Sequence, residues 1–226
     1  MLVMVSNHVS WRTHYLQGRY GGLALLLPPC RLMGPYPHLP YAVDNGAFPA
    51  WKNGEPWDEA TFVKALDWVA DQQLLPRWIV VPDVVTDPEG TFEAWEEWAP
   101  RLRRLGVPLA LAVQDGMTPA EVYARADPEV IFVGGSRDWK LATRREWAKR
   151  FPRVHVGRVN GVRDLLACRQ LGVESVDGTG FFRGRRKQLE GLIDYLEAFQ
   201  VEDDLAPMFA PKDDGHPVLP FGETDD

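Results

Sequence analysis

The sequence predicts a single (β/α)₈ barrel, in which a closed ring of parallel strands is covered by helices. Eight short apolar runs recur along the chain, and runs of this kind are typical of parallel strands buried on both faces. Helix-like segments separate the later runs, as in consecutive βαβ units. With 226 residues, 45% of them hydrophobic, the chain is long enough to fill one such domain.

The first half of the chain supplies four of the expected strands. They lie at residues 2–5, 23–27, 41–48 and 78–83, and the third and fourth end on Asp44 and Asp83. Residues 11–20 are polar and aromatic and are compatible with a short helix. Residues 30–40 carry three prolines and predict an irregular loop. A helix to about residue 73 begins near Asp58, with Phe62, Leu66 and Val69 on one face.

The second half alternates more regularly between strand and helix. Strands are expected at 108–113, 130–133, 154–156 and 173–176, and helices at 92–105, 119–126, 139–151, 162–171 and 185–199. Gly106 ends the first of these helices in the usual manner of a C-terminal glycine. The barrel domain is therefore assigned to residues 1–200. Residues 201–226, rich in proline and acidic side chains, predict an extended tail.

Charge and composition limit the classes of function. The formal net charge of -7 argues against broad electrostatic capture of nucleic acid, because phosphate binding rests on clustered Lys and Arg. A local basic patch remains open, with the alternative that these side chains only solvate a helix start. Its candidate members are Arg158, Arg183, Arg185, Arg186 and Lys187.

Targeting and redox signals are few. No apolar stretch is long enough to span a bilayer, and the opening residues lack the basic leader of a signal peptide, so we expect a soluble, cytoplasmic protein with no membrane partner. Cys30 and Cys168 lie far apart and beside no histidine at ligand spacing. They predict free thiols and no metal site.

Polar residues and glycines follow most of the predicted strands. They are Asp44, Asp83, Gln114, Gly134, Gly135, Gly157 and Asp177. Because the carboxyl ends of all strands surround one mouth in such a barrel, these residues are expected to meet there. A lone Asp-Gly such as Asp177-Gly178 is more typical of a turn or a helix cap, and the repetition at successive strand ends is what favours a site.

Two carboxylates at one mouth suit a particular chemistry. One can act as nucleophile and the other as proton carrier in displacement at a sugar carbon, through a covalent glycosyl intermediate. A further carboxylate, an amide and glycine N–H groups suit the edge of a purine, since Asp accepts hydrogen bonds and N–H groups donate them. Phe48 can stack on the base.

The order of motifs resembles that of the tRNA-guanine transglycosylase superfamily. Six blocks carry the resemblance between residues 41 and 180, namely Val43-Asp44-Asn45-Gly46-Ala47-Phe48, Val81-Pro82-Asp83, Ala112-Val113-Gln114-Asp115-Gly116, Phe132-Val133-Gly134-Gly135, Val156-Gly157 and Val176-Asp177. The resemblance implies that Asp177 is the nucleophile and Asp44 the acid and base. It also implies that Asp83, Gln114, Gly157 and the backbone of Gly134 and Gly135 hold the guanine.

The departures from the family narrow the expectation. The tRNA enzymes carry a zinc site in a C-terminal insertion, and its Cys-x-Cys-x-x-Cys spacing has no counterpart here. Ala47 and Pro49 replace a glycine and a glutamine of the family pattern. A short chain without the zinc subdomain is most similar to the DpdA-type enzymes, including phage forms, which place 7-deazaguanine bases in DNA. The resemblance therefore implies a cofactor-independent pentosyltransferase that exchanges guanine in DNA for preQ0 or a relative.

Other readings of the same residues stay open. The polymer can be tRNA in place of DNA, or water can replace the incoming base, which would make the protein a nucleoside or glycoside hydrolase. A third class is a base-binding or nucleic-acid-binding subunit without catalysis. The oligomeric state is open as well.

Overall fold

The computed structural model describes residues 1–6, 9–184 and 186–199. The acidic tail at 201–226 and Arg185, both named above, lie outside the described residues. None of the described helices combines the length and apolar character that a membrane span needs.

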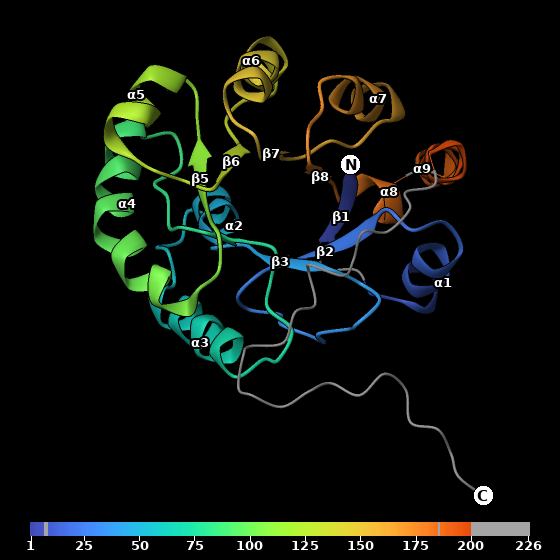
Figure 1. Ribbon diagram of the computed structural model, residues 1–226, viewed down its shortest axis with the longest axis horizontal. Helices are drawn as coiled ribbons and strands as arrows, with labels where there is room; N and C mark the ends of the chain where they lie inside the picture. The colour runs from blue at the N-terminus through green and yellow to red at the C-terminus, as the bar shows by residue number, and fades with distance from the viewer. Residues whose placement is uncertain (7–8, 185, 200–226) are drawn as a thin grey trace, which may run out of the picture.

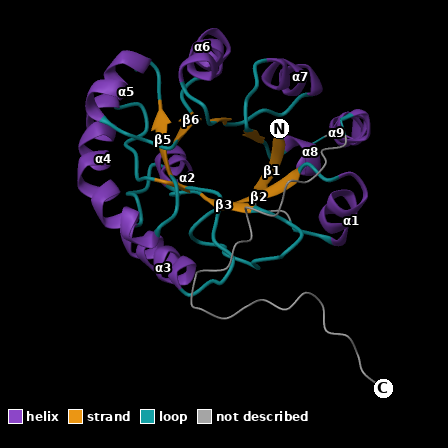
Figure 2. Cartoon of the chain, viewed as in Figure 1, coloured by secondary structure: helices purple, strands orange, loops and turns teal. Residues whose placement is uncertain are grey.

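Eight parallel strands close into a barrel, which confirms the predicted fold (Figures 1 and 2). Each strand pairs with its sequence neighbour, and β8 pairs with β1 to close the ring. The strands are β1 (Leu2–Ser6), β2 (Leu23–Leu27), β3 (Tyr41–Val43), β4 (Ile79–Val80), β5 (Leu109–Val113), β6 (Val130–Val133), β7 (Val154–Val156) and β8 (Ser175–Asp177).

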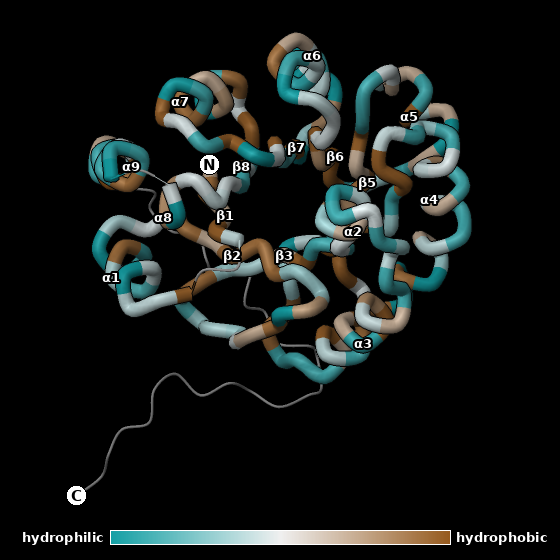
Figure 3. Tube along the Cα trace, turned by 180° about the vertical axis from the view of Figure 1, so that it is seen from behind, coloured by the Kyte–Doolittle hydropathy of each residue, from teal (hydrophilic) through white to brown (hydrophobic). Residues whose placement is uncertain are grey.

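Helices surround the ring of strands, as Figure 2 shows. The longer ones are α1 (Trp11–Tyr20), α3 (Glu59–Ala70), α4 (Pro88–Leu102), α6 (Arg137–Arg150), α7 (Val162–Gln170) and α9 (Arg186–Ala198), and the shorter ones are α2 (Ala47–Asn53), α5 (Pro119–Arg125) and α8 (Gly180–Arg183). A 3₁₀ turn (Arg103–Leu105) follows α4. Figure 3, seen from behind, shows α2 inside the ring of outer helices.

The barrel interior is filled by side chains of different sizes. Trp78 is fully buried there with Met4 and Leu26, Phe132 packs against the cluster, and alanines from β2, β3 and β5 complete it. A second apolar layer, which includes Trp95 and Trp98 of α4, packs between strands and helices.

Two short helices were not expected from the sequence. α2 contains Pro49 in its first turn, where proline is tolerated because its missing N–H has no helical partner. α8 has only four residues and begins at Gly180. β8 also ends one residue later than predicted, so Asp177 belongs to the strand ladder and pairs with Met4 of β1.

Candidate active site

A cavity of about 820 Å³ lies at the carboxyl ends of the strands, within the size range of small-molecule sites. Residues from β1, β2, β4, β5, β6 and β8 line it, together with residues that follow β3 to β8. The predicted site residues among them are Asp44, Phe48, Asp83, Gln114, Gly134, Gly135, Gly157, Arg158 and Asp177. The structure therefore brings together residues up to 133 positions apart in sequence (177 minus 44).

Asp177 is held by one of its two carboxylate oxygens. Its Oδ1 accepts hydrogen bonds from His155 Nε2 at 3.1 Å and from the Arg158 backbone N–H at 3.1 Å. Only 8% of the residue is exposed. No residue within the described part of the chain bonds to Oδ2. One oxygen is thus fixed, and the other is left toward the cavity.

Asp44 has an environment that retains a proton. Burial, together with the charges of Asp177 and Asp83, raises the pKa of its carboxyl from 3.8 to about 7. The Asn45 backbone N–H, which donates to Oδ1 at 2.9 Å, opposes the shift. Near neutral pH, Asp44 can therefore either give or take a proton.

Asp83 is anchored by two side-chain amides. Asn45 Nδ2 donates to its Oδ1 at 2.7 Å, and Gln114 Nε2 donates to its Oδ2 at 3.2 Å. Burial raises the pKa of Asp83, and the Asn45 hydrogen bond opposes this in part, so the pKa moves from 3.8 to about 6. At pH 7 the group is therefore mostly ionised and able to accept hydrogen bonds from a ligand.

Gln114 lies beneath Asp83 with its amide fully engaged. Its Nε2 also lies 2.9 Å from Val84 O and 2.7 Å from Thr91 Oγ1, so its two hydrogens are shared among three acceptors, while its Oε1 accepts from the Thr86 backbone N–H. A direct bond to a base would require one of these contacts to be given up. In this structure Gln114 positions Asp83 and the loop that follows it.

The glycines at the strand ends differ in what they can offer. The N–H of Gly134 donates to Val113 O and that of Gly157 to Val133 O, so both belong to the barrel ladder. Gly135 has a left-handed backbone (φ +67°), and no described residue accepts from its N–H. Of the pair expected to meet a base oxygen, only Gly135 has a donor to spare.

Arg158 crosses the mouth of the cavity. Its guanidinium lies over the Phe48 ring at 4.7 Å from the centroid, and it donates to the carbonyl oxygen of Gly135. The side chain was expected to contact phosphate, yet here it covers the ring on which a base was expected to stack. Entry of a planar ligand at Phe48 would require this side chain to move.

The remaining basic candidates lie outside the cavity lining. Arg183 and Lys187 are exposed, and Arg186 pairs with Glu190 on α9 at 2.6 Å. These three residues do not border the cavity. Their contact with a nucleic acid remains a prediction.

Sequence reasoning missed four residues that build the site. Asn45 is buried and joins Asp83 to the start of α2 through its amide, which accepts from the Ala47 N–H at 2.8 Å.

Lys140 of α6 bonds to the Gly157 carbonyl, and burial lowers the pKa of its ammonium to about 8. His155 and Ser175 lie in the barrel wall below Asp177. The available signal was a polar residue flanked by valines in a short buried strand, as in Val-His-Val.

The described residues contain no group of three or more His, Cys, Asp or Glu side chains placed to hold a metal ion. Cys30 is exposed and Cys168 is buried, and neither is in a disulfide. The cavity thus combines three carboxyl groups. Asp44 has a pKa of about 7, Asp177 accepts hydrogen bonds through one oxygen, and Asp83 is bonded to two side-chain amides. Such a set can attack an electrophilic carbon, transfer a proton and accept hydrogen bonds from a ligand.

Comparisons with known proteins bear on the fold. No protein-family model and no curated protein matches the chain. Among solved structures, the tryptophan synthase complex from Pyrococcus furiosus is similar, with a TM-score of 0.52, 12% identity, and coverage of 88% of this chain and 98% of that one. A mutant tryptophan synthase alpha-subunit from the same organism gives 0.51 and 12%, covering 87% and 95%. At this identity the likeness shows the barrel alone.

Proposed function

We propose that the protein is a guanine transglycosylase that exchanges guanine in DNA for a 7-deazaguanine base through a covalent bond between Asp177 and the sugar. The observation that carries this proposal is the pair of aspartates in one cavity. Asp44 and Asp177 both line it, and the charge of Asp177 helps to raise the pKa of Asp44 to about 7. The motif order of the sequence supports the assignment of the substrate as guanine.

In the first step, Asp177 attacks C1′ of the target nucleotide. The new C1′–O bond forms as the C1′–N9 bond breaks, and the electron pair leaves with the guanine. Asp44 gives its proton to the departing base. A carboxyl with a pKa near the working pH is suited to this role, since enough of it is protonated to donate.

The second step reverses the roles. The N9–H of the incoming 7-deazaguanine loses its proton to Asp44, and N9 displaces Asp177 from C1′. Two inversions retain the configuration at the sugar. One glycosidic bond is exchanged for another, so no external energy source is needed.

Base recognition is assigned to Asp83, Gly135 and Phe48, which line the same cavity. Ionised Asp83 can accept hydrogen bonds from guanine N1–H and from its exocyclic amine, while the free N–H of Gly135 can donate to O6. Phe48 is 37% exposed and offers a stacking surface once the Arg158 guanidinium is displaced. Gln114 and Asn45 keep Asp83 in place by the amide bonds described above.

The polymer is assigned to DNA on the resemblance to the short transglycosylases without a zinc subdomain. An enzyme that acts at C1′ from inside such a cavity reaches a base only when the base has left the stack, which costs about a few kcal/mol in a duplex. Arg158, Arg183, Arg186 and Lys187 are the described candidates for phosphate contacts.

The test is an exchange assay with nucleoside mass spectrometry. The protein is incubated with labelled guanine or preQ0 and with either DNA or tRNA, and intact-protein mass spectrometry looks for a sugar adduct. Label in DNA is expected, and Asp177→Asn should lose both label and adduct. Asp138→Asn, on an exposed position at the start of α6, is the matched control and should keep full exchange.

Three outcomes would replace the proposal. Label in tRNA alone would change the polymer. Free guanine and abasic sites in the absence of an added base would identify a hydrolase. Unchanged nucleic-acid binding by Asp177→Ala, with neither adduct nor exchange in the unaltered protein, would identify a binding subunit.

A further inference from the structure

A buried histidine lies directly behind the proposed nucleophile. His155 of β7 has no exposed surface, and its two ring nitrogens contact two residues of β8. Nε2 lies 3.1 Å from Asp177 Oδ1, and Nδ1 lies 2.9 Å from Ser175 Oγ. Ser175 pairs with His155 in the strand register, so the chain Ser175–His155–Asp177 is built into the barrel wall.

The chemistry of the three partners fixes the proton. An ionised carboxylate only accepts hydrogen bonds, so Nε2 must carry the hydrogen that joins it to Asp177. Nδ1 of the neutral ring is then an acceptor, and the Ser175 hydroxyl can donate to it. The ring packs against both Trp78 and Phe132, at centroid distances of 5.0 and 4.6 Å. Its orientation is therefore set by packing as well as by hydrogen bonds.

A second donor converges on the same oxygen. The backbone N–H of Arg158 also reaches Oδ1, at 3.1 Å, from a residue whose φ is 57°. A left-handed backbone is uncommon for a residue other than glycine and is often retained at functional positions. Two donors on Oδ1, and none from the described residues on Oδ2, make the two oxygens inequivalent.

We propose that His155, kept as the Nε2–H tautomer by Ser175, is a positioning residue that fixes Oδ1 of Asp177 and leaves Oδ2 as the oxygen that bonds to the sugar. The inference rests on the proposed function and extends it to the separate roles of the two carboxylate oxygens of Asp177. When the C1′–Oδ2 bond forms, Oδ1 becomes the carbonyl oxygen of an ester and its hydrogen bonds weaken. When that bond breaks, negative charge returns to the carboxylate, and the two donors stabilise it.

Attack on C1′ and release of the sugar from Asp177 should respond differently to loss of the His155 hydrogen bond. Loss of the His155 donor should slow release of the sugar from Asp177 more than it slows attack, because charge develops on the carboxylate only during release. Removal of a hydrogen bond to a charged group corresponds to about a 10- to 100-fold loss in rate. The covalent adduct should therefore accumulate.

The first test reads the proton directly and needs no activity. Nitrogen NMR of the full chain labelled at histidine, with the His155 signal assigned by its absence from His155→Gln, reports the tautomer. The neutral ring with hydrogen on Nε2 is expected at pH 7. Hydrogen on Nδ1 alone, or on both nitrogens, would overturn the inference.

The second test compares two substitutions at the same buried position. His155→Leu fills the space without a donor, whereas the side-chain amide of His155→Gln can return an N–H near Nε2. For His155→Leu, kcat should fall by about 10- to 100-fold, with adduct present at steady state. KM for the DNA should fall with kcat, so that kcat/KM for the DNA stays within about threefold of the original, because the attack step is retained. His155→Gln should recover most of the loss. Equal rates for both variants, at any level, would count against the inference.

The two tests separate this inference from the proposed function. If the unaltered protein exchanges no base on DNA or tRNA, the proposed function fails, whatever the NMR result. If exchange occurs but hydrogen resides on Nδ1, the proposed function stands and the role of His155 is wrong. Circular dichroism of both variants identifies a loss of rate that is caused by unfolding. If His155→Leu unfolds, Ser175→Ala takes its place in the test. Ser175→Ala should give a mixture of the two His155 tautomers and slow the release of the sugar.

Discussion

Asp44 illustrates at the scale of one residue how surroundings decide protonation. The carboxyl lies in a cavity with two other aspartates, and burial together with their charges raises its pKa from 3.8 to about 7. An ordinary exposed aspartate would be almost fully ionised at that pH and would be a poor proton donor. The rate of the proposed exchange should therefore follow the protonation of this group.

The first prediction concerns the pH dependence of catalysis. Above about pH 7, kcat should fall by about tenfold per pH unit, because the form of the enzyme with a protonated Asp44 becomes scarce. Asp44→Asn should lose about 10²- to 10⁴-fold in rate. Single-turnover rates between pH 5 and pH 9 check both points. If the residual activity of Asp44→Asn still falls above about pH 7, the group that titrates there is not Asp44.

The same pKa predicts that Asp44→Asn, which lowers the rate, raises the stability at alkaline pH. The folded-state pKa of about 7 lies above the ordinary value of 3.8, so the folded state holds a proton that the unfolded state has released between these two values. The stabilisation from that proton is fully present below about pH 3.8 and is lost as the pH rises through 7. At pH 8, Asp44→Asn should melt about 2–4 °C higher than the original chain.

Calorimetry at two pH values tests this effect. The melting temperatures of the original chain and of Asp44→Asn should converge at pH 4, where the carboxyl is protonated in the folded protein. Equal melting temperatures at pH 8 would show that burial of Asp44 does not destabilise the ionised form.

At the scale of elements, the end of β7 shows why glycine follows a strand next to the nucleophile. A Cβ at Gly157 would lie 2.9 Å from the Phe132 ring and 3.3 Å from Asp177 Oδ1. The first contact is closer than packed atoms tolerate, so Phe132 would have to shift, and the ring of His155 packs against it. Glycine therefore allows β6, β7 and β8 to converge around Asp177.

Gly157→Ala is expected to reduce catalysis more than stability. The substitution forces a small overpacking, which costs about 1–3 kcal/mol, and it displaces the group that orients Asp177. We expect at least a tenfold loss of exchange with the fold retained, measured by single-turnover kinetics and by urea unfolding. The control must be a glycine with open space around it and with a backbone that alanine can adopt. Gly54 after α2 has the space, but its φ of +70° would strain an alanine. Gly161→Ala, with open space and an extended backbone, should leave the rate unchanged.

The loop after β7 and the short helix α2 meet through one pair of side chains. Arg158 of the loop covers Phe48 of α2 with its guanidinium, so a base can stack on that ring only after the arginine moves. Arg158→Ala retains the backbone N–H that bonds to Asp177. It should therefore lower KM for the incoming base without a matching change in kcat, and base-titration kinetics check this. A large fall in kcat with KM unchanged would instead assign the guanidinium to the transition state.

For the whole molecule, the positions and order of the strands could be predicted from the sequence. The side-chain contacts between neighbouring strands could not. Short apolar runs such as Leu23–Leu27 are continuous because parallel barrel strands are buried on both faces, so their positions and the fold followed directly. The carboxyl ends of those strands then had to meet, which located Asp44 and Asp177. Short elements such as α2, which contains Pro49, were not predicted.

The partners of the site residues depend on register, which local sequence does not specify. His155 reaches Asp177 only because β7 pairs with β8 so that His155 stands beside Ser175. Gln114 reaches Asp83 only because β5 lies next to β4. No pattern within one segment distinguishes a free amide from one already bonded to a neighbouring strand. The residues that support the site were therefore missed, while those that end the strands were found.

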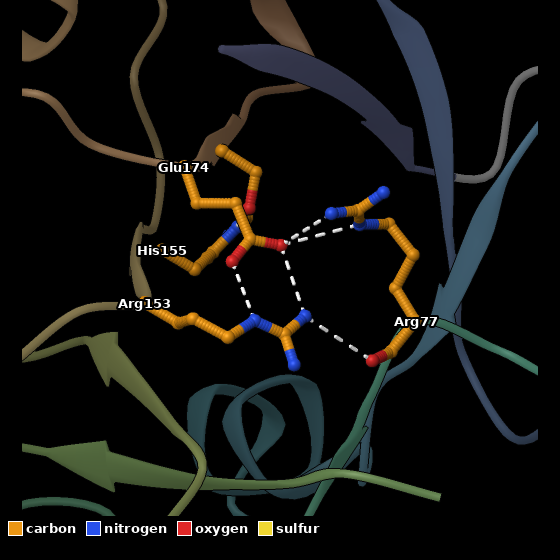
Figure 4. Close-up of polar contacts among 5 residues, drawn as sticks. Arg77, Arg153, His155 and Glu174 are labelled. Atoms are coloured by element: carbon orange, nitrogen blue, oxygen red, sulfur yellow. Dashed lines mark hydrogen bonds and ion pairs between the residues drawn. The ribbon is translucent and has the colours of Figure 1, made fainter. Parts of the chain in front are cut away.

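The opposite end of the barrel carries an ion-pair cluster that joins three strands. Glu174, before β8, accepts from Arg153 Nε at 2.7 Å and from Arg77 Nη2 at 2.7 Å (Figure 4). Arg153 precedes β7 and Arg77 precedes β4. The Glu174 side chain is 16% exposed. Contacts of this kind at the face away from the mouth contribute to stability, and the chemistry takes place at the other face.

The last prediction follows from the pKa of this carboxyl. Burial opposes ionisation, but the two arginines outweigh it through hydrogen bonds and charge, so the pKa falls from 4.5 to about 2. The resulting stabilisation is present above about pH 4.5 and is lost as the pH falls toward 2. Glu174→Gln should therefore lower the free energy of unfolding by about 2–3 kcal/mol at pH 7, and by less at pH 3, in urea titrations at both pH values. Exchange activity of the folded variant should stay within about twofold of the original, since the cluster lies at the far end of the barrel from Asp177. An equal loss of stability at both pH values would mean that packing of the side chain, and not its charge, joins the three strands.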